Sequence, residues 1–216
     1  MRRITRLSSC SALALALAGG PAFADLTAQQ VWDGLESAMQ GFGYSVAATE
    51  TATSSGLDVT DVVLRIVAPE ENSTVEVTME SIALVERGDG SVSMTFPATV
   101  PITIDAAPEG EEAVNMALTY TNDGLEVVVS GDPGNMTYAY NANQLAISLA
   151  ELTVDGTAIG REEARFDFVM DDVTGTTITA TAQGTQITQN VQAAAASYDM
   201  AFNDPETDEA GLVSGG

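Results

Sequence analysis

The chain has 216 residues, of which 31 are acidic, seven are arginine and none is lysine or histidine, so its formal net charge is −24. Such a surface repels nucleic acid and anionic membranes, because affinity for phosphates comes mainly from Lys and Arg side chains. Without histidine or lysine, Ser-His and Cys-His dyads and Schiff-base chemistry are excluded, and zinc would have only carboxylate ligands.

The first 24 residues have the three parts of a secretory signal peptide. Arginines stand at the start, an apolar core covers Ser11–Ala18, and Ala22-Phe23-Ala24 supplies small residues at the cleavage positions. The apolar core is shorter than the roughly 20 residues that a spanning helix needs. We therefore expect cleavage after Ala24, a periplasmic mature chain from Asp25 and no stable membrane span. The leader takes three of the seven arginines and no acidic residue, so the mature charge is −27.

The beginning of the mature chain predicts one amphipathic helix. Thr27 is a suitable N-cap, and Gln30 stands at the capping-box position three residues later. Gly41 and Gly43 are typical of a helix end. Apolar side chains fall on one stripe at helical spacing, and they are Ala28, Val31, Trp32, Leu35, Ala38, Met39 and Phe42. We expect this stripe, with the only tryptophan, to pack against the rest of the fold.

From Tyr44 onward apolar residues recur with a period of two, which predicts about ten antiparallel strands. The parity of the alternation changes between Met79 and Ile82. Turn sequences at 87–90, 122–124 and 131–134 are expected to reverse the chain. No linker divides residues 25–216, so we expect one mainly β (α+β) domain, an open curved sheet or a sandwich. This domain is either a whole protein or the amino-terminal part of a longer one.

Residues 91–104, SVSMTFPATVPITI, place an apolar side chain at every even position. These side chains would share one face of a strand and form a candidate apolar ligand face of Val92, Met94, Phe96, Ala98, Val100, Ile102 and Ile104. Pro97 and Pro101 have the other parity and indicate an edge strand, a bulge or a crossing between sheets. A helix of about 15 residues is roughly 22 Å long, so it cannot cover a strand of roughly 45 Å. The part of the apolar face that the helix leaves uncovered needs another sheet or a ligand to cover it.

The sequence contains no recognisable catalytic or cofactor motif. Four adjacent acidic pairs point to opposite faces of a strand or into water, and they are Glu70-Glu71, Glu111-Glu112, Glu162-Glu163 and Asp171-Asp172. Asp167, between two phenylalanines, is the first candidate for a catalytic acid. Asp204, Glu206 and Asp208 alternate as calcium ligands do, but Glu209 stands where the EF-hand loop requires glycine. We expect no catalytic residue, no metal ligand and no cofactor.

The basic leader ending in Ala-x-Ala, the mature start DLTAQQVW and the acidic, lysine-poor run of β-hairpins together resemble an exported alphaproteobacterial family of unknown function (domain of unknown function 2125). The resemblance is most specific over residues 1–45 and transfers no catalytic residue. It implies an envelope protein with an extended sheet, similar to the long concave sheets that handle lipids between bacterial membranes.

These observations favour a non-enzymatic periplasmic binding or scaffold protein, whose partner is a lipid-like ligand or another envelope protein. An outer-membrane β-barrel is the main alternative, since alternating strands suit it too. Aromatic residues make up only 6% of the chain, which is thin for two aromatic girdles. A carboxylate-based hydrolase is a weaker alternative.

Overall fold

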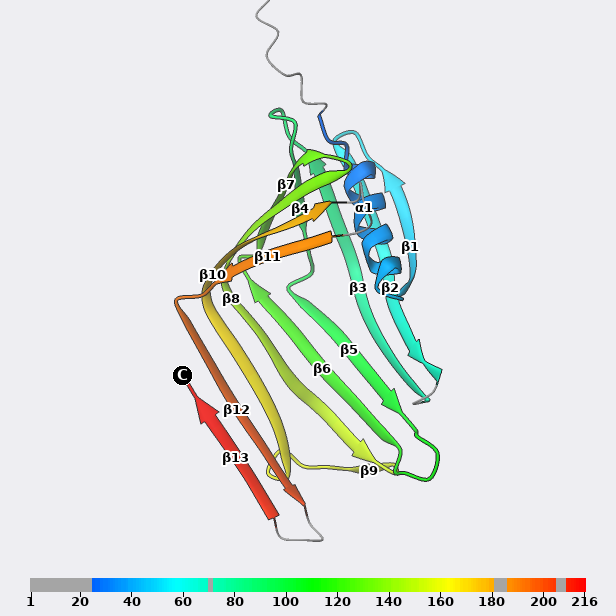
Figure 1. The fold of residues 1–216 in the computed structure, drawn as a ribbon, viewed down its shortest axis with the longest axis vertical. Coiled ribbons are helices and arrows are strands. Elements are labelled where there is room, and N and C mark those ends of the chain that lie inside the picture. The colour runs from blue at the N-terminus through cyan, green and yellow to red at the C-terminus, as the bar shows by residue number, and fades with distance from the viewer. Residues whose placement is uncertain (1–24, 70–71, 181–185, 205–208) are drawn as a thin grey trace, which may run out of the picture.

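The computed structural model describes residues 25–69, 72–180, 186–204 and 209–216 (Figure 1). In these residues one helix, α1 (Ala28–Gly41), precedes an antiparallel sheet of thirteen strands, which confirms the predicted mainly β fold. Thr27 caps the helix: its Oγ1 accepts from the backbone N–H of Gln30, and the Gln30 side chain accepts from that of Thr27. None of the described helices is long and apolar enough to cross a bilayer. The predicted leader lies outside the described residues.

The strands are β1 (Ser45–Ala52), β2 (Gly56–Ala68), β3 (Ser73–Glu86), β4 (Val92–Thr95), β5 (Thr99–Ala106), β6 (Val114–Asp123), β7 (Glu126–Asp132), β8 (Asn135–Val154), β9 (Thr157–Ala158), β10 (Ala164–Ala180), β11 (Gln186–Gln192), β12 (Ala195–Asp204) and β13 (Glu209–Gly215). The main path of the sheet begins at β1 and ends at β13, so the described sheet is open.

Three positions in the sheet are each occupied by two collinear strands. β4 and β5 both pair with β3, β7 and β6 both pair with β8, and β11 and β12 both pair with β10. The predicted reversals at 87–90 and 131–134 are therefore confirmed as hairpins. The predicted reversal at 122–124 is wrong. The chain continues from β6 into β7 in one direction along β8, and Gly124 (φ 64°) only interrupts the strand.

The interruptions line up across the sheet in a row that we call the midline. It consists of Asp61 in β2, Phe96–Ala98 between β4 and β5, Gly124–Leu125 between β6 and β7, Asp172 in β10, and Ala193–Ala194 between β11 and β12. At the midline the alternation of buried and exposed side chains changes parity. In β2, for example, Val59 and Val62 are both fully buried although they are three residues apart. The same change occurs in β3, as the sequence predicted, so one face stays apolar along the whole length of the strands.

Two residues of the midline, Asp61 and Asp172, have a left-handed backbone conformation, with φ of 53° and 49°. Aspartate tolerates this conformation better than β-branched residues do. We expect Asp61→Val to lower the free energy of unfolding by about 1–2 kcal/mol, whereas Asp61→Gly stays close to the wild type. Urea unfolding measures both, and Thr78→Val, at an exposed position of β3, is the β-branched control. If Asp61→Val is as stable as the control, the left-handed conformation of Asp61 is contradicted.

Helix α1 lies mainly over the part of the sheet on one side of the midline, which we call the helix half (Figure 1). It reaches past the midline at β2 and β3, where Val62, Leu64 and Met79 also pack beneath it. This half contains β4, β7, β11 and the adjoining ends of β2, β3, β8 and β10. Val31 and Trp32 pack into a cluster with fully buried residues such as Val59, Ile82 and Val129. The cluster is the main core of the protein.

Polar contacts fix the position of α1 on this core. The indole Nε1 of Trp32 donates to Glu50 Oε1 at 2.9 Å, and Glu86 Oε1 accepts from the backbone N–H of Ala28 at the helix start at 2.9 Å. Gly34 brings the helix close to β8, because a Cβ at this position would lie 2.6 Å from Met136 Cε. The helix is therefore bound at its N-terminus, its middle and one side.

The other side of the midline, the open half, contains β5, β6, β12, β13 and the adjoining ends of β3, β8 and β10. Among the residues that the structure describes, none from β5, β6, β12 or β13 belongs to the core cluster under α1. Pro101 lies in this half, and the ladder between β5 and β3 begins directly after it, at Ile102. This agrees with the absence of an N–H on proline.

Candidate functional site

The open half presents one apolar face and one polar face. Directly opposed residues of antiparallel strands share a face, so the pairs Val77↔Ile102, Ile102↔Leu118 and Leu118↔Leu149 make one apolar row across four strands. Parallel rows complete the open apolar face, which comprises Val75, Val77, Val100, Ile102, Ile104, Met116, Leu118, Tyr120, Leu145, Ile147, Leu149, Leu152, Val154, Phe166, Phe168, Met170, Tyr198, Met200, Phe202 and Val213.

The opposite face of the same strands is mostly polar. It carries side chains such as Thr103, Asp105, Thr119, Ser148 and Asp199, which alternate with the apolar residues along each strand. This is the pattern of a sheet with one side in water and the other side against something apolar. In the helix half that apolar partner is α1. From β5 to β13 the open half has no such partner among the described elements (Figure 1).

The open apolar face is only partly shielded by its own side chains. Val100 and Leu149 are 6% and 5% exposed, but Phe202 and Val213 near the β13 edge are 53% and 50% exposed. Seven strands about 4.8 Å apart and eight to ten residues long span about 30 Å in each direction. Contiguous apolar surface of this size exceeds what a monomeric protein usually leaves exposed, and it is typical of a ligand or partner site.

Two cavities lie at opposite ends of this face. The proximal cavity, of about 160 Å³, lies at the midline beneath α1 and is lined by apolar residues that include Trp32, Leu35, Met79 and Phe96. The distal cavity, of about 540 Å³, lies at the far end between β8 and β10. Leu152, Val154 and Phe202 belong both to its wall and to the open apolar face. The apolar surface therefore continues into a hollow at each end.

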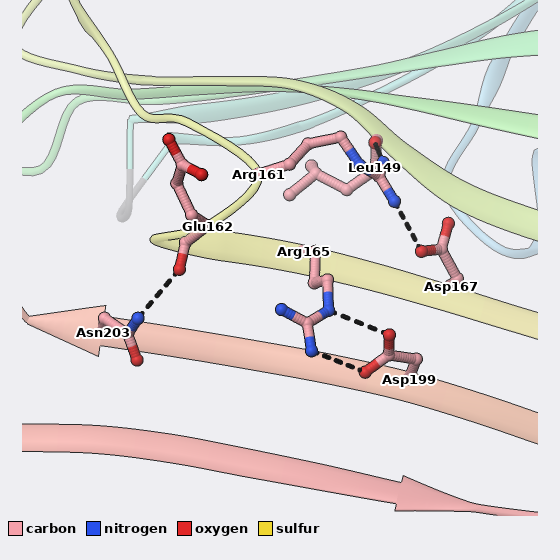
Figure 2. Close-up of polar contacts among 7 residues, drawn as sticks. All are labelled: Leu149, Arg161, Glu162, Arg165, Asp167, Asp199 and Asn203. Carbon is pink, nitrogen blue, oxygen red and sulfur yellow. Dashed lines mark hydrogen bonds and ion pairs between the residues drawn. The ribbon is translucent and has the colours of Figure 1, made fainter.

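The distal cavity exists because β8 and β10 diverge. Their pairing extends to Ser148↔Asp167, and β8 is irregular just beyond this point, between Leu149 and Glu151. Arg161 bridges the divergence (Figure 2): its Nη1 donates to the Leu149 carbonyl at 3.0 Å and its Nη2 to Asp167 Oδ2 at 2.6 Å. The loop after β9 is fastened in this way to both strands.

A second ion pair connects β10 to β12 on the polar face. Arg165 binds Asp199 through Nε and Nη2, at 2.9 and 3.1 Å (Figure 2). The hydrogen bonds from Arg165 lower the pKa of the Asp199 carboxyl, and the same bonds raise the pKa of Arg165. Asn203 at the end of β12 donates to the Glu162 carbonyl at 2.8 Å. These contacts hold the strands that border the distal cavity.

The predicted candidate acid, Asp167, lies on the polar face as the partner of Arg161. Asp199 stands directly opposite it on β12, and this second carboxylate is bound by Arg165. Among the described residues no cluster of three or more His, Cys, Asp or Glu side chains is arranged to hold a metal ion. Glu70-Glu71 and the calcium candidates Glu206 and Asp208 lie outside the described residues.

The seven residues of the predicted ligand face lie on two collinear strands and the break between them. Val92 and Met94 in β4 are 0% and 2% exposed and belong to the core under α1. Phe96 lines the proximal cavity, and Ala98 is exposed at the midline. The last three residues of the set, Val100, Ile102 and Ile104, belong to the open apolar face.

Sequence reasoning missed the contributions of β6, β8, β10 and β12 to this face. The alternation of Leu145, Ile147 and Leu149, and of Phe166 and Phe168, is visible in the sequence. Alternation assigns residues to one side of their own strand, but only the register shows that these sides are the same side of the sheet.

A scan of the sequence against protein-family models finds no match, and searches of curated proteins and of solved structures find none either. The resemblance of residues 1–45 to an exported family therefore stays a prediction.

Proposed function

We propose that the mature protein is a non-enzymatic periplasmic protein that binds the acyl chain of a lipid-like ligand on the open apolar face. The observation that carries this proposal is the asymmetry of the open half, which has one polar face and one extended apolar face without a covering element in the described residues. The periplasmic location rests on the leader-like pattern of the first 24 residues.

The size of the face agrees with binding of a chain of ordinary length. A buried methylene group contributes about 0.8 kcal/mol, so twelve methylenes supply about 10 kcal/mol. Ordering the chain and the complex costs several kcal/mol of this. A dissociation constant in the micromolar range is therefore expected for a single acyl chain.

A scaffold role in the envelope is the second candidate, and the β13 edge favours it. Leu212 and Val213 are 67% and 50% exposed and lie on opposite faces of this edge strand. Beyond Glu209 at its start this edge strand has no charged residue, and an edge with apolar residues on both faces is suited to pairing with a strand of another protein. Such a partner would extend the sheet beside the open apolar face rather than fill it.

The proposal predicts saturable binding of a fluorescent acyl probe to the mature protein. We expect a micromolar dissociation constant, and we expect Ile102→Asp to weaken binding by about tenfold or more, because it places a carboxylate on the open apolar face. Thr103→Asp is the matched control, since the neighbouring residue of β5 lies on the polar face and should leave binding unchanged.

Thermal melting of each variant verifies that the sample is folded before its affinity is compared. Absence of saturable binding by a folded, monodisperse wild type would reject the acyl-binding function. Equal affinities for Ile102→Asp and Thr103→Asp would show that the probe binds elsewhere.

A further inference from the structure

The distal cavity combines an apolar wall, an exposed aromatic ring and several carboxylates. Leu152 and Val154 continue the open apolar face into the cavity, and the ring of Phe202, which is 53% exposed, lies on the same face. The carboxylates among its lining residues are Glu112, Asp155 and Glu163. Carboxylates beside an aromatic ring are the groups that proteins use to recognise amines and quaternary ammonium ions.

Backbone donors orient two of these carboxylates. Asp155 Oδ1 accepts from the Ala113 N–H at 2.8 Å, and Glu163 Oε2 accepts from the Gly160 N–H at 3.0 Å. Within the part of the chain that the structure describes, the second oxygen of each has no protein donor, and no arginine pairs with any of the three carboxylates. The cavity therefore keeps uncompensated negative charge.

Among the residues that the structure describes, no positive group is placed to receive an anionic polar end. The arginines after the leader are Arg65, Arg87, Arg161 and Arg165. Arg161 and Arg165 are bound by Asp167 and Asp199 at 2.6 and 2.9 Å. Arg65 lies on the polar face opposite Glu76, and Arg87 lies in the hairpin between β3 and β4. A phosphate or carboxylate entering the distal cavity would meet three carboxylates and no cation.

We propose that the distal cavity binds the cationic polar end of an amphiphile whose acyl chain lies along the open apolar face. This inference rests on the proposed function and adds the chemical class of the ligand. The chain contributes most of the affinity, because it buries apolar surface. The carboxylates and the Phe202 ring select the charge of the polar end, since they attract an ammonium group and repel an anion.

The test compares three probes with the same dodecyl chain, each below its micelle concentration: dodecyltrimethylammonium, dodecyl maltoside and dodecanoate. Isothermal titration of the mature protein at low ionic strength should give dodecyltrimethylammonium an affinity about tenfold or more above that of dodecanoate, with the maltoside between them. The difference should shrink at about 0.5 M salt, because the Debye length then falls to a few ångströms.

Glu112→Gln and Glu126→Gln make a matched pair, because they remove the same charge from the distal cavity and from the polar face of β7. We expect only Glu112→Gln to reduce the preference for the cationic probe, by about threefold or more. Equal binding of all three probes, or an equal response to the two variants, overturns this inference and leaves the acyl-binding function intact. If none of the probes binds a folded sample, the proposed function fails and the inference fails with it.

Discussion

Replacement of Trp32 by alanine will lower the free energy of unfolding by about 3–5 kcal/mol, the usual cost of removing a large buried aromatic side chain. Trp32 is 2% exposed at the centre of the contact between α1 and the sheet. Its removal enlarges the proximal cavity that it lines and takes the indole donor from Glu50. A helix of 14 residues is not stable without tertiary contacts, so loss of this anchor will weaken the attachment of the whole of α1.

Urea unfolding followed by far-ultraviolet circular dichroism measures this effect, because the strand signal does not depend on the tryptophan. Phe42→Ala is the control: it removes an aromatic ring from the C-cap of the same helix, but Phe42 is 54% exposed. It should cost less than about 1 kcal/mol. A similar midpoint for the two variants would show that α1 does not form the main core.

Replacement of Val100 by aspartate will cost several kcal/mol, whereas Thr99→Asp will cost well under about 1 kcal/mol. Val100 is 6% exposed and lies opposite Tyr120 on the open apolar face, and burial at this place already raises the pKa of the Tyr120 hydroxyl. Thr99 is exposed, lies opposite Thr121 and belongs to the polar face.

The pH dependence of Val100→Asp gives an independent measurement. Burial favours the neutral acid, so the new carboxyl will have a raised pKa in the folded protein. Its destabilising effect relative to the wild type is therefore complete at pH 7 and decreases as the pH falls toward the ordinary aspartate pKa of about 4. Equal melting temperatures for the two aspartate variants at pH 7 would mean that the two faces have been assigned wrongly.

The acidity of the chain opposes aggregation through the open apolar face. A formal net charge of −24 makes neighbouring molecules repel one another at low ionic strength. The polar face of the open half remains hydrated at the same time. Two of the few arginines, Arg161 and Arg165, form ion pairs between neighbouring segments on the polar face.

The midline explains how one sheet can pack against α1 in the helix half and present an uncovered apolar face in the open half. The left-handed residues Asp61 and Asp172 and the break at Phe96–Ala98 change the parity of the strands at the same level. The helix half can then close over α1, while the open half keeps its apolar side chains on the same face without a helix above them. A single uninterrupted meander would have put one half of its apolar residues into water on the other side.

The helix and most strands could be predicted from the sequence, because their signals are local. The capping box of Thr27 and Gln30, the apolar stripe of α1 and the hairpin turns at 87–90 and 131–134 all depend on residues within one or two turns of the chain. The parity change between Met79 and Ile82 was visible for the same reason. The split of apolar from polar residues within β5 also followed from the spacing of two.

Tertiary structure alone decided which of these apolar sides meet and which remain uncovered. The segment 122–124 has the composition of a turn, yet the pairing of both β6 and β7 with β8 keeps the chain running straight. Val92 and Ile102 have the same sequence pattern, but the position of α1 buries the first and leaves the second on the open face. The physical reason is that burial depends on what lies across the sheet, and strand register and helix docking are set by residues far apart in the sequence.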